Sequence, residues 1–309
     1  MEEMTPKIYA IVVTYKGKEW YDRCFGSLVK SEVPLQVIAV NNSPDDTELY
    51  LAERFPMVKV ISSHGNIGFG QANNLGIRYA MEGGADYLFL LNQDAWIEPD
   101  TIGKLLRISE IHTDYGILGC MNLTKEKDHL LYGFIPMIAD PANCDRRLID
   151  DMYFGRMKDV YEIKDILAAA WWLPVSTVHT VGGFDPLFPH YGEDNNYQQR
   201  VLYHGLKIGV CPHCPIVHDT VVRTDCAIRL REGLYAFERN LKLEWLDINK
   251  NFHPLRIFLR ELRRCAKFAL KGDYGKANRA WRAMMLLCRE VGSVSRHRKL
   301  YRTTGELFL

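Results

Sequence analysis

The triplet Asn92-Gln93-Asp94 follows an apolar run, Tyr87–Leu91, and places an amide and a carboxylate two residues apart. At the tip of a buried strand, both groups can face one hard cation. Mg²⁺ or Mn²⁺ held there would bridge a diphosphate and neutralise its charge as it departs. The alternative is an Asx turn that leads into a helix opened by Pro99. The triplet alone therefore predicts either a divalent-cation site or a turn.

An acidic pair, Glu193-Asp194, comes after the glycine-rich turn Gly182-Gly183-Phe184-Asp185 and opens a helical pattern that runs to Tyr203. The positive end of the helix dipole favours an ionised carboxylate at this position. An ionised carboxylate suits a general base that takes a proton from a hydroxyl group. The alternative is that both acids only cap the helix.

The scaffold for these residues is predicted from the rhythm of the first 120 residues. Strand patterns cover Ile8–Thr14, Gln36–Val40, Val58–Ser62, Tyr87–Leu91 and Ile117–Met121. Helical patterns cover Lys16–Lys30, a segment capped by Ser43 with Pro44 at its first position, Gly68–Met81 and the segment opened by Pro99. Alternating strands and helices predict a doubly wound α/β fold with a mostly parallel sheet.

Ligands of such sheets bind at the carboxyl ends of the strands. Here those ends are Thr14-Tyr15, Asn41-Asn42-Ser43, Ser62–Gly70 and Asn92-Gln93-Asp94. Short polar clusters that follow apolar strands are where binding groups are expected. The segment from Asn122 to Lys164 is irregular, and its sequence fits either a hairpin or a mobile loop.

The chain becomes strongly basic towards its C-terminus. From Asn251 onward there are 14 Lys or Arg against 4 Asp or Glu, a surplus of 10 positive charges in a chain whose net charge is +1. From Pro254 an apolar stripe and a basic stripe repeat with helical spacing, and a second such segment follows from about Tyr274 to Glu290. These helices either pack on the rest of the protein or also contact an anionic membrane.

Composition and segment lengths limit the class of protein. Apolar residues make up 47% and charged residues 25% of the 309 positions, as in ordinary globular proteins. No apolar run reaches the roughly 18 residues of a membrane-spanning helix. The acidic start, MEEMTPK, leads straight into a strand and does not resemble a signal peptide. We therefore expect a cytoplasmic protein whose eight cysteines are mainly reduced thiols.

Two other hypotheses about function rest on a cysteine motif and on a glycine motif. Cys211-Pro-His-Cys214 has the spacing of a redox pair, and a zinc site formed with His218 and Cys226 is conceivable. However, an apolar strand pattern rather than a helix follows the motif. A dinucleotide-binding fold is excluded because G-x-G-x-x-G does not follow the first strand.

Six blocks in order give the chain a specific resemblance: VVTY, AVNNS, GNIGFGQANNLGI, FLLNQDAWIEPD, GGFDPLF…YGEDNNYQQR and PIVHD. Together they resemble glycosyltransferase family 2, and within it the rhamnosyltransferase-like branch that builds bacterial surface polysaccharides. The resemblance covers roughly Ile8 to Asp219. It implies a GT-A fold and an inverting single displacement from a nucleoside diphosphate sugar to an acceptor hydroxyl.

The resemblance also implies roles for individual residues. Asp94 would be the metal carboxylate for Mn²⁺ or Mg²⁺, and Asp194 would be the base. His218 would face the metal or the diphosphate from the far side, and the alternative is a core histidine with its hydrogen bonds satisfied at a strand end. The donor would be bordered by Thr14, Tyr15, Asn42, Asn66, Gly68, Gln71, Asn74 and Asn92. Separately from the resemblance, Trp171 and Trp172 precede the glycine-rich turn and are expected, with Glu193, to contact the acceptor; the alternative for the tryptophan pair is the core.

We therefore expect a GT-A domain over residues 1–225, with a nucleotide-sugar half (1–121) and an acceptor half (122–225), and a basic helical region over 226–309. The expected partners are a nucleotide-sugar donor and a glycan or lipid-linked acceptor, with no nucleic acid. The expected location is the cytoplasm, with contact at the inner face of its membrane. The remaining alternatives are a non-catalytic sugar-nucleotide binder and a Cys211/Cys214 zinc or redox protein. The sequence departs from the family pattern at two places. Asn41-Asn42 affects which nucleotide base is expected, and Asn196 affects how the acceptor is expected to bind.

Overall fold

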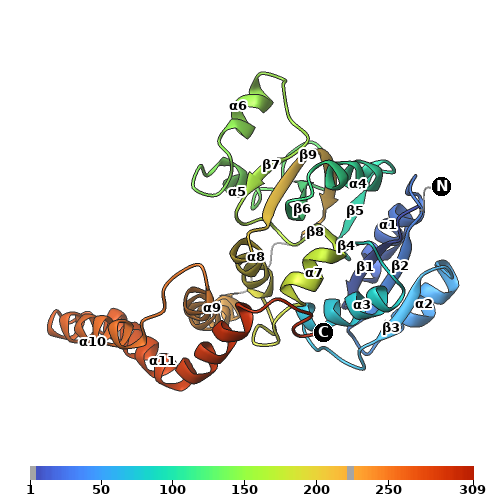
Figure 1. The fold of residues 1–309 in the computed structure, drawn as a ribbon. Helices are drawn as coiled ribbons and strands as arrows, with labels where there is room; N and C mark the ends of the chain where they lie inside the picture. The colour runs from blue at the N-terminus through green and yellow to red at the C-terminus, as the bar shows by residue number, and fades with distance from the viewer. Residues whose placement is uncertain (1–4, 221–225) are drawn as a thin grey trace. The chain divides into compact units, whose positions relative to one another are not determined.

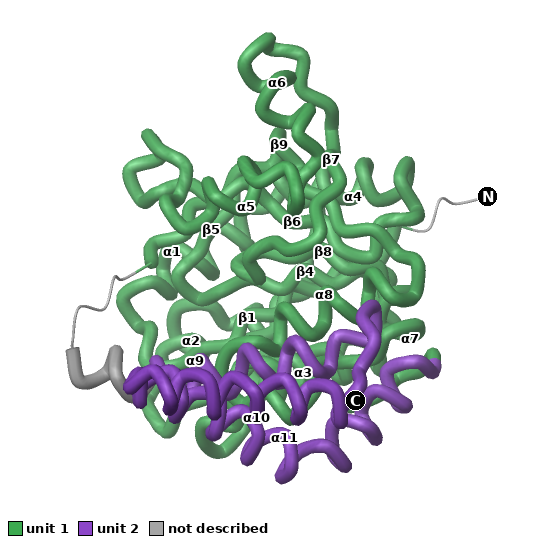
Figure 2. Tube along the Cα trace, turned by 90° about the vertical axis from the view of Figure 1, so that its left-hand side faces the viewer, with its two compact units in different colours: residues 1–222, 304–309 green, residues 223–303 purple. Residues whose placement is uncertain are grey.

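Two units make up the chain, and each is described separately (Figure 2). The sheet unit comprises Met1–Val222 and Thr304–Leu309, and the helical unit comprises Arg223–Thr303. The structure is a computed structural model that describes residues 5–220 and 226–309, apart from the side chains of 226–232 and 234. The expected domain boundary at 225 lies close to this division, but the return of 304–309 to the sheet unit is not foreseen by the sequence.

A mixed sheet of nine described strands forms the middle layer of the sheet unit (Figure 1). Its strands are β1 (Ile8–Thr14), β2 (Gln36–Asn41), β3 (Lys59–Ser62), β4 (Tyr87–Asn92), β5 (Ala95–Ile97), β6 (Tyr115–Leu123), β7 (Tyr161–Ile163), β8 (Ala170–Pro174) and β9 (Lys207–His218). Their order is β3-β2-β1-β4-β8-β6-β9-β5, and β7 pairs with β9. Strands β3, β2, β1 and β4 are parallel, whereas β8 is antiparallel to both β4 and β6. The β6–β9 ladder is parallel as well, so the expected parallel pairing occurs among β3, β2, β1 and β4 and again between β6 and β9, and the antiparallel strands make the sheet mixed.

Helices cover both faces of this sheet. They are α1 (Lys18–Val29), α2 (Thr47–Arg54), α3 (Phe69–Glu82), α4 (Thr101–Ile111), α5 (Ile135–Ala139), α6 (Arg147–Tyr153), α7 (Val175–Val181) and α8 (Glu193–Tyr203). Successive residues of β1 point to opposite faces: Ile11 joins a core cluster with Ile77 of α3, and Val12 joins another with Phe25 of α1. Burial on both faces explains why the strand is a continuous apolar run.

The start of α2 differs from the prediction. The helix begins at Thr47, because the segment from Ser43 forms a side-chain turn ahead of it. Ser43 Oγ donates to Asp45 Oδ2 (2.7 Å), and Asp45 Oδ1 accepts the backbone N–H of Thr47 (3.1 Å). The Ser43 hydroxyl thus has its hydrogen-bond acceptor in Asp45, and Asp45 binds the first N–H of the helix. Ser43 is therefore not the helix cap.

The helical unit consists of α9 (Cys226–Leu246), α10 (Pro254–Leu270) and α11 (Tyr274–Tyr301). Buried Arg298 of α11 donates to the carbonyl oxygens of Trp245, Asp247 and Lys250 at 2.8, 2.6 and 2.6 Å. One guanidinium therefore holds the end of α9 and the connection that follows it. Among the helices in the described residues, none is both long enough and apolar enough to cross a membrane.

Residues 304–309 pack within the sheet unit beside the glycine-rich turn. The Leu307 carbonyl accepts the N–H of Gly183 (2.7 Å), and the Phe308 carbonyl accepts from Asn74 Nδ2 (3.1 Å). Gly182 has φ +82° and ψ −161°, and a Cβ atom there would lie 2.4 Å from the Leu307 oxygen. Glycine is therefore required at position 182 both by the backbone conformation and by this close approach.

Candidate active site

The tips of β1 and β4 are joined by a reciprocal amide contact. Gln93 Oε1 accepts the N–H of Tyr15 (2.8 Å), and Gln93 Nε2 donates to the Tyr15 carbonyl (2.9 Å). This contact leaves the Tyr15 side chain 39% exposed at the sheet edge, while Thr14 is buried and donates to the Val40 carbonyl (3.4 Å). Tyr15 can therefore contact a ligand, whereas Thr14 supports the strand from inside. Gln93 is missed by the sequence analysis, because its role depends on a contact between distant strands.

Asn42 organises the loop that leads into α3. It donates to Asn66 Oδ1 (3.2 Å) and accepts from the N–H of Ile67 (2.9 Å) and from Ser63 Oγ (3.0 Å). Asn66 in turn accepts the N–H of Gly68 (2.9 Å). Buried Asn42 therefore shapes this wall of the edge, and exposed Asn66 is the more accessible of the two amides.

Gly68 makes a close approach to another loop of the same unit. Its φ is +86°, and a Cβ atom at this position would lie 2.2 Å from the Pro189 carbonyl oxygen. The glycine therefore permits contact with the protein itself, where the sequence analysis expected contact with a donor.

Two amides of α3 bind the turn at Phe184. Asn74 Nδ2 donates to the Phe184 carbonyl (2.8 Å) and Asn74 Oδ1 accepts its N–H (2.8 Å), while Gln71 Nε2 donates to the same carbonyl (3.3 Å). Asn74 is buried. Both polar atoms of its side chain bind the protein. Asn74 therefore supports the turn at Phe184 and does not border the donor as expected.

The pairing of β5 with β9 brings Asp94 and His218 together. Ala95 lies opposite His218 in this antiparallel ladder, and the Asp94 carbonyl accepts the N–H of Asp219 (2.8 Å). As a result, His218 Nε2 lies 3.4 Å from Asp94 Oδ1. Both residues are expected around one cation, and the structure places them side by side.

Asn122 determines how His218 presents its ring. Asn122 Nδ2 donates to the Cys120 carbonyl (2.9 Å), which leaves Oδ1 to accept from His218 Nδ1 (3.2 Å). A neutral His218 with its proton on Nδ1 turns the Nε2 lone pair toward the Asp94 carboxylate. Two acceptors at this distance repel each other unless a proton or a metal ion is shared between them. Carboxylate and imidazole are both suitable ligands of Mn²⁺, so this pair fits a divalent cation.

Further features are consistent with such an ion. Asn92 Oδ1, two residues before Asp94, is buried with no hydrogen-bond partner among the described residues. No group of three or more His, Cys, Asp or Glu side chains in the described part of the chain forms a metal cage. A cation held by Asp94 and His218 would need further ligands, and phosphate oxygens of a substrate commonly supply them to Mg²⁺.

The acids at the start of α8 lie beside α3. Gly192, with φ +91°, precedes the helix, and a Cβ atom on Gly70 of α3 would lie 3.3 Å from the Cβ of Glu193. The first turns of both helices therefore meet near the carboxyl edge of the parallel strands. Glu193 is buried, and Asp194 Oδ1 accepts the N–H of Asn195 (2.8 Å). Burial raises the pKa of Asp194, which makes its carboxylate a stronger base.

Asp165 is a second carboxylate that the sequence analysis missed. Its Oδ1 accepts from Asn195 Nδ2 (2.9 Å) and from Gln198 Nε2 (2.8 Å), so it is fixed against the first turns of α8. Burial raises the pKa of Asp165, and its negative charge contributes to the raised pKa of Asp194. A lone aspartate ahead of an apolar strand gives no sequence signal for this arrangement.

Asn196 points into the core of the sheet unit. It is fully buried and accepts from Arg200 Nε (3.1 Å), while Arg200 also donates to the carbonyls of Val181 and Gly183 (2.7 Å each). The expected effect of Asn196 on acceptor binding is therefore indirect, through the glycine-rich turn that Arg200 holds.

Trp171 and Trp172 cannot stack on an acceptor sugar, because both are 0% exposed. As neighbours in β8 they point to opposite faces of the sheet: Trp171 stacks on Phe184 (centroids 6.3 Å apart) and Trp172 on Tyr87 (5.0 Å). The expected acceptor role is wrong, and the core alternative is what the structure shows.

Cys211 and Cys214 lie in a bulge within β9. Cys211 pairs with Cys120 of β6, and the next pair is Met121 with Pro215. Both thiols are buried, and the pKa of Cys211 is raised by its hydrogen bond with Cys214 and by burial. A raised pKa disfavours the thiolate that redox and zinc chemistry require. The side chain of Cys226, proposed as a further zinc ligand, lies outside the described residues.

Comparison with known proteins shows the fold and a family match over part of the chain. Residues 9–154 match the sequence profile of Glycosyl transferase family 2. The dTDP-rhamnosyl transferase RfbF of Shigella flexneri is 24% identical over 265 residues, which cover 84% of this chain and 86% of that protein.

Two solved structures are similar at low identity. The mannosyltransferase PcManGT of Pyrobaculum calidifontis, in complex with GDP-Man and Mn²⁺, has a TM-score of 0.58 at 15% identity, covering 95% of this chain and 76% of that one. TarS 1–349 of S. aureus, in complex with UDP, has a TM-score of 0.55 at 14% identity, covering 78% of this chain and 65% of that one. At these identities the likeness shows the fold. The chain has the GT-A fold, and its residues 9–154 match the model of Glycosyl transferase family 2.

Proposed function

We propose that this protein transfers a sugar from a nucleoside diphosphate donor to an acceptor hydroxyl, with inversion at the anomeric carbon. The observation that carries the proposal is the pairing of Asp94 with His218 at the carboxyl edge of the sheet, where Asp94 Oδ1 and His218 Nε2 lie 3.4 Å apart. Ligands of open α/β sheets bind at this edge. The family match over residues 9–154 supports the reaction class.

Asp94 and His218 are the residues that would hold a divalent ion. Such an ion, when bound, neutralises negative charge on a departing diphosphate. Tyr15 and Asn66 present exposed groups toward the nucleotide, and the amides of Asn42 and Gln93 keep their loops in place. Binding both substrates in line contributes much of the rate by making the step effectively unimolecular.

Asp194 acts as the general base in this proposal. As the acceptor oxygen attacks the anomeric carbon, its proton passes to the Asp194 carboxylate, and the bond between that carbon and the diphosphate oxygen breaks. The raised pKa of Asp194 supports the role, because the ideal base has a pKa drawn toward the working pH. Glu193, next to it, is buried, and we propose that it supports the first turn of α8 behind the acceptor instead of contacting the acceptor directly.

The finer assignment is a rhamnosyltransferase of bacterial surface polysaccharide synthesis, supported by the similarity to RfbF of Shigella flexneri. The neighbouring structures contain GDP-Man and UDP, so the base is best decided by experiment. We further propose a lipid-linked or glycan acceptor met at the cytoplasmic face of the membrane.

A thermal-shift panel tests the donor site first. The protein is heated with dTDP, UDP and GDP and with their sugars, each with and without Mn²⁺. A ligand at 100 times its Kd stabilises the folded state by about 2.7 kcal/mol. We expect a Mn²⁺-dependent rise in Tm for one nucleotide, followed by transfer of its sugar to an acceptor extract. No rise with any nucleotide would contradict the proposal, and binding without transfer would favour a non-catalytic sugar-nucleotide binder.

A further inference from the structure

Helix α10 of the helical unit presents three distinct faces. The side that packs against α11 carries the least exposed residues, which recur every three or four positions. They are Ile257, Phe258, Glu261, Cys265 and Phe268. Packing of this face leaves two others, one apolar and one basic, at the surface.

The second face is apolar and exposed. Leu255 is 70% and Leu270 89% exposed, and Leu259 and Leu262 lie between them with nearly half of their surface exposed. With 3.6 residues per turn, these four leucines and Ala266 form one continuous stripe along the helix. Contiguous exposed apolar surface of this kind marks an interaction site more often than scattered single residues do.

The third face is basic and lies directly beside the leucine stripe. All of its residues are exposed. They are Arg256, Arg260, Arg263, Arg264, Lys267 and Lys271. A helix that exposes leucines next to a row of Lys and Arg has the composition of a helix lying in a membrane interface.

Glu261, the only acidic residue of α10, is turned away from this surface. It is buried and accepts from Arg260 Nε (2.9 Å) and Arg264 Nη1 (3.1 Å). Glu261 therefore pairs with two of the six cations of the basic face, but its own carboxylate is not exposed there.

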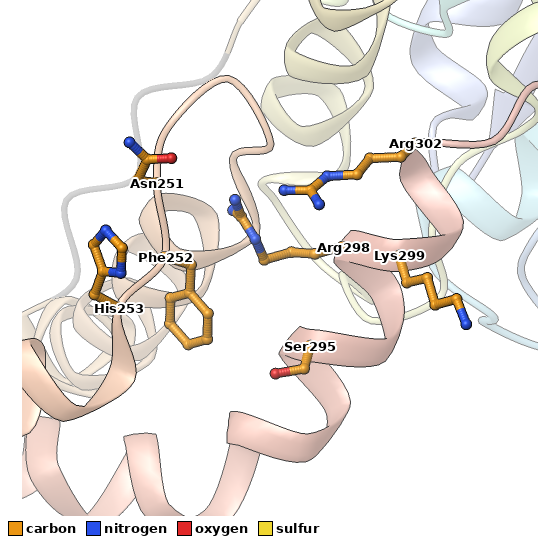
Figure 3. Close-up of a pocket in the computed structure, with 7 residues that line it drawn as sticks. All are labelled: Asn251, Phe252, His253, Ser295, Arg298, Lys299 and Arg302. Atoms are coloured by element: carbon orange, nitrogen blue, oxygen red, sulfur yellow. The ribbon is translucent and has the colours of Figure 1, made fainter.

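More cationic and apolar groups flank α10 within the helical unit. A pocket of about 250 Å³ at the start of α10 is lined by His253, Lys299 and Arg302 among others (Figure 3). The guanidinium of Arg298, also in its lining, is bound to backbone carbonyls. On α11, Trp281 and Met285 lie one turn apart, each 53% exposed.

We propose that the exposed leucine and basic faces of α10 bind an anionic phospholipid surface. The leucines would enter the boundary between headgroups and acyl chains, and the basic row would lie against the anionic headgroups. A second copy of the chain is disfavoured, because facing leucine stripes would bring two basic rows together. Nucleic acid is disfavoured as the partner because a phosphate backbone offers no apolar surface against which the leucine stripe could be buried. The inference deepens the proposed membrane-side location but does not depend on transfer activity.

Vesicle flotation with the full chain tests this surface. We expect binding to phosphatidylglycerol-containing vesicles, weak binding to pure phosphatidylcholine, and loss of most binding at high salt. Replacing Arg256, Arg263 and Lys267 with Gln removes three charges, each worth about fivefold near an anionic surface, so binding should fall on the order of 100-fold. Replacing Leu255, Leu259 and Leu262 with Ala should lower it at least about tenfold.

The matched control removes the same charge from the sheet unit, at exposed Lys30, Arg78 and Arg107, each replaced by Gln. It should bind vesicles like the unaltered chain. Equal losses in control and test variants would overturn the proposal, since net charge alone would then explain binding. So would an absence of vesicle binding, or leucine variants that abolish a dimer in sedimentation velocity without affecting vesicles. Ala and Gln preserve the helix, and unchanged Tm confirms folding. Asp194→Asn should bind vesicles normally, so failure of the transfer proposal is distinguishable.

Discussion

His218 Nε2 lies 3.4 Å from Asp94 Oδ1 because the β5–β9 ladder pairs His218 with Ala95, the residue after Asp94. Asn122 holds the opposite nitrogen of the ring at 3.2 Å. The two elements that carry this pair are far apart in the sequence, so the contact depends on the whole sheet being formed.

Asp94→Ala should remove the Mn²⁺-dependent part of donor binding. The substitution takes away the only carboxylate of the pair, and His218 alone is a weak ligand set. We expect the thermal shift with nucleotide and Mn²⁺ to fall to the value seen with nucleotide alone. Glu53→Ala, an exposed acid on α2, is the control and should keep the full shift. A full Mn²⁺-dependent shift in Asp94→Ala would remove Asp94 from the cation site.

Asp194→Asn should separate binding from turnover. The amide has nearly the same shape but cannot accept a proton, and loss of a general base typically lowers the rate by about 10²–10⁴-fold. We expect kcat to fall in that range, while the donor Kd from titration calorimetry stays within about twofold. Wild-type turnover would show that another group takes the proton.

Asp165→Asn should shift the pH dependence of transfer. Asparagine still accepts from Asn195 and Gln198 through its oxygen, but it removes the negative charge that raises the pKa of Asp194. A base must be deprotonated to act, so activity rises with pH through the pKa of Asp194. Lowering that pKa moves the acid limb of the kcat/KM profile to lower pH.

For Asp165→Asn we also predict the effect on the stability of the folded protein. The folded-state pKa of Asp165 is raised, so its ionisation weakens the fold as pH rises through that pKa. The Asn variant should therefore be at least as stable as the original at neutral pH. An unmoved acid limb together with a lowered Tm would show that Asp165 has only a structural role.

Gly182→Ala should destabilise the sheet unit. A side chain at φ +82° is strained, and its Cβ would lie 2.4 Å from the Leu307 carbonyl oxygen. Gly205→Ala is the control, because φ there is +77° but nothing lies within 4 Å of the added atom. Left-handed strain costs about 1–2 kcal/mol, and the conformation of Gly182, with φ +82° and ψ −161°, is essentially restricted to glycine. We expect a loss of about that size at 205 and a clearly larger loss at 182, measured by chemical unfolding. Equal losses would mean that the contact with Leu307 contributes little.

Regular parts of the sheet unit are predictable from local patterns. The strand Ile8–Thr14 and the helix Glu193–Tyr203 occur with the predicted bounds, because burial on two faces and a polar helix start leave clear marks in the sequence. The order of strands in the second half is not predictable in this way. An antiparallel β8 between β4 and β6 depends on pairing energies among distant segments.

The residues of the candidate site also fall into those that the sequence predicts and those that it does not. Asp94 and His218 belong to motifs that the resemblance places around one ion, and the structure brings them together. Gln93 and Asp165 act through contacts with backbone or side chains far along the chain, so residue type alone does not reveal them. For the tryptophan pair the sequence predicts a functional role that the structure does not support. Two adjacent aromatic residues look the same in a sequence whether they lie in a core or at a sugar-binding site.

The return of residues 304–309 to the sheet unit makes the helical unit an insertion rather than an appendix. A variant cut at residue 222 would lose the Leu307 and Phe308 carbonyls along with the helices, and would leave Gly183 and Asn74 without those acceptors. Loss of activity in such a truncation would therefore be ambiguous. Replacing 223–303 with a flexible linker that retains 304–309 would remove the helices while sparing the glycine-rich turn, and would assign the lost property to the correct part of the chain.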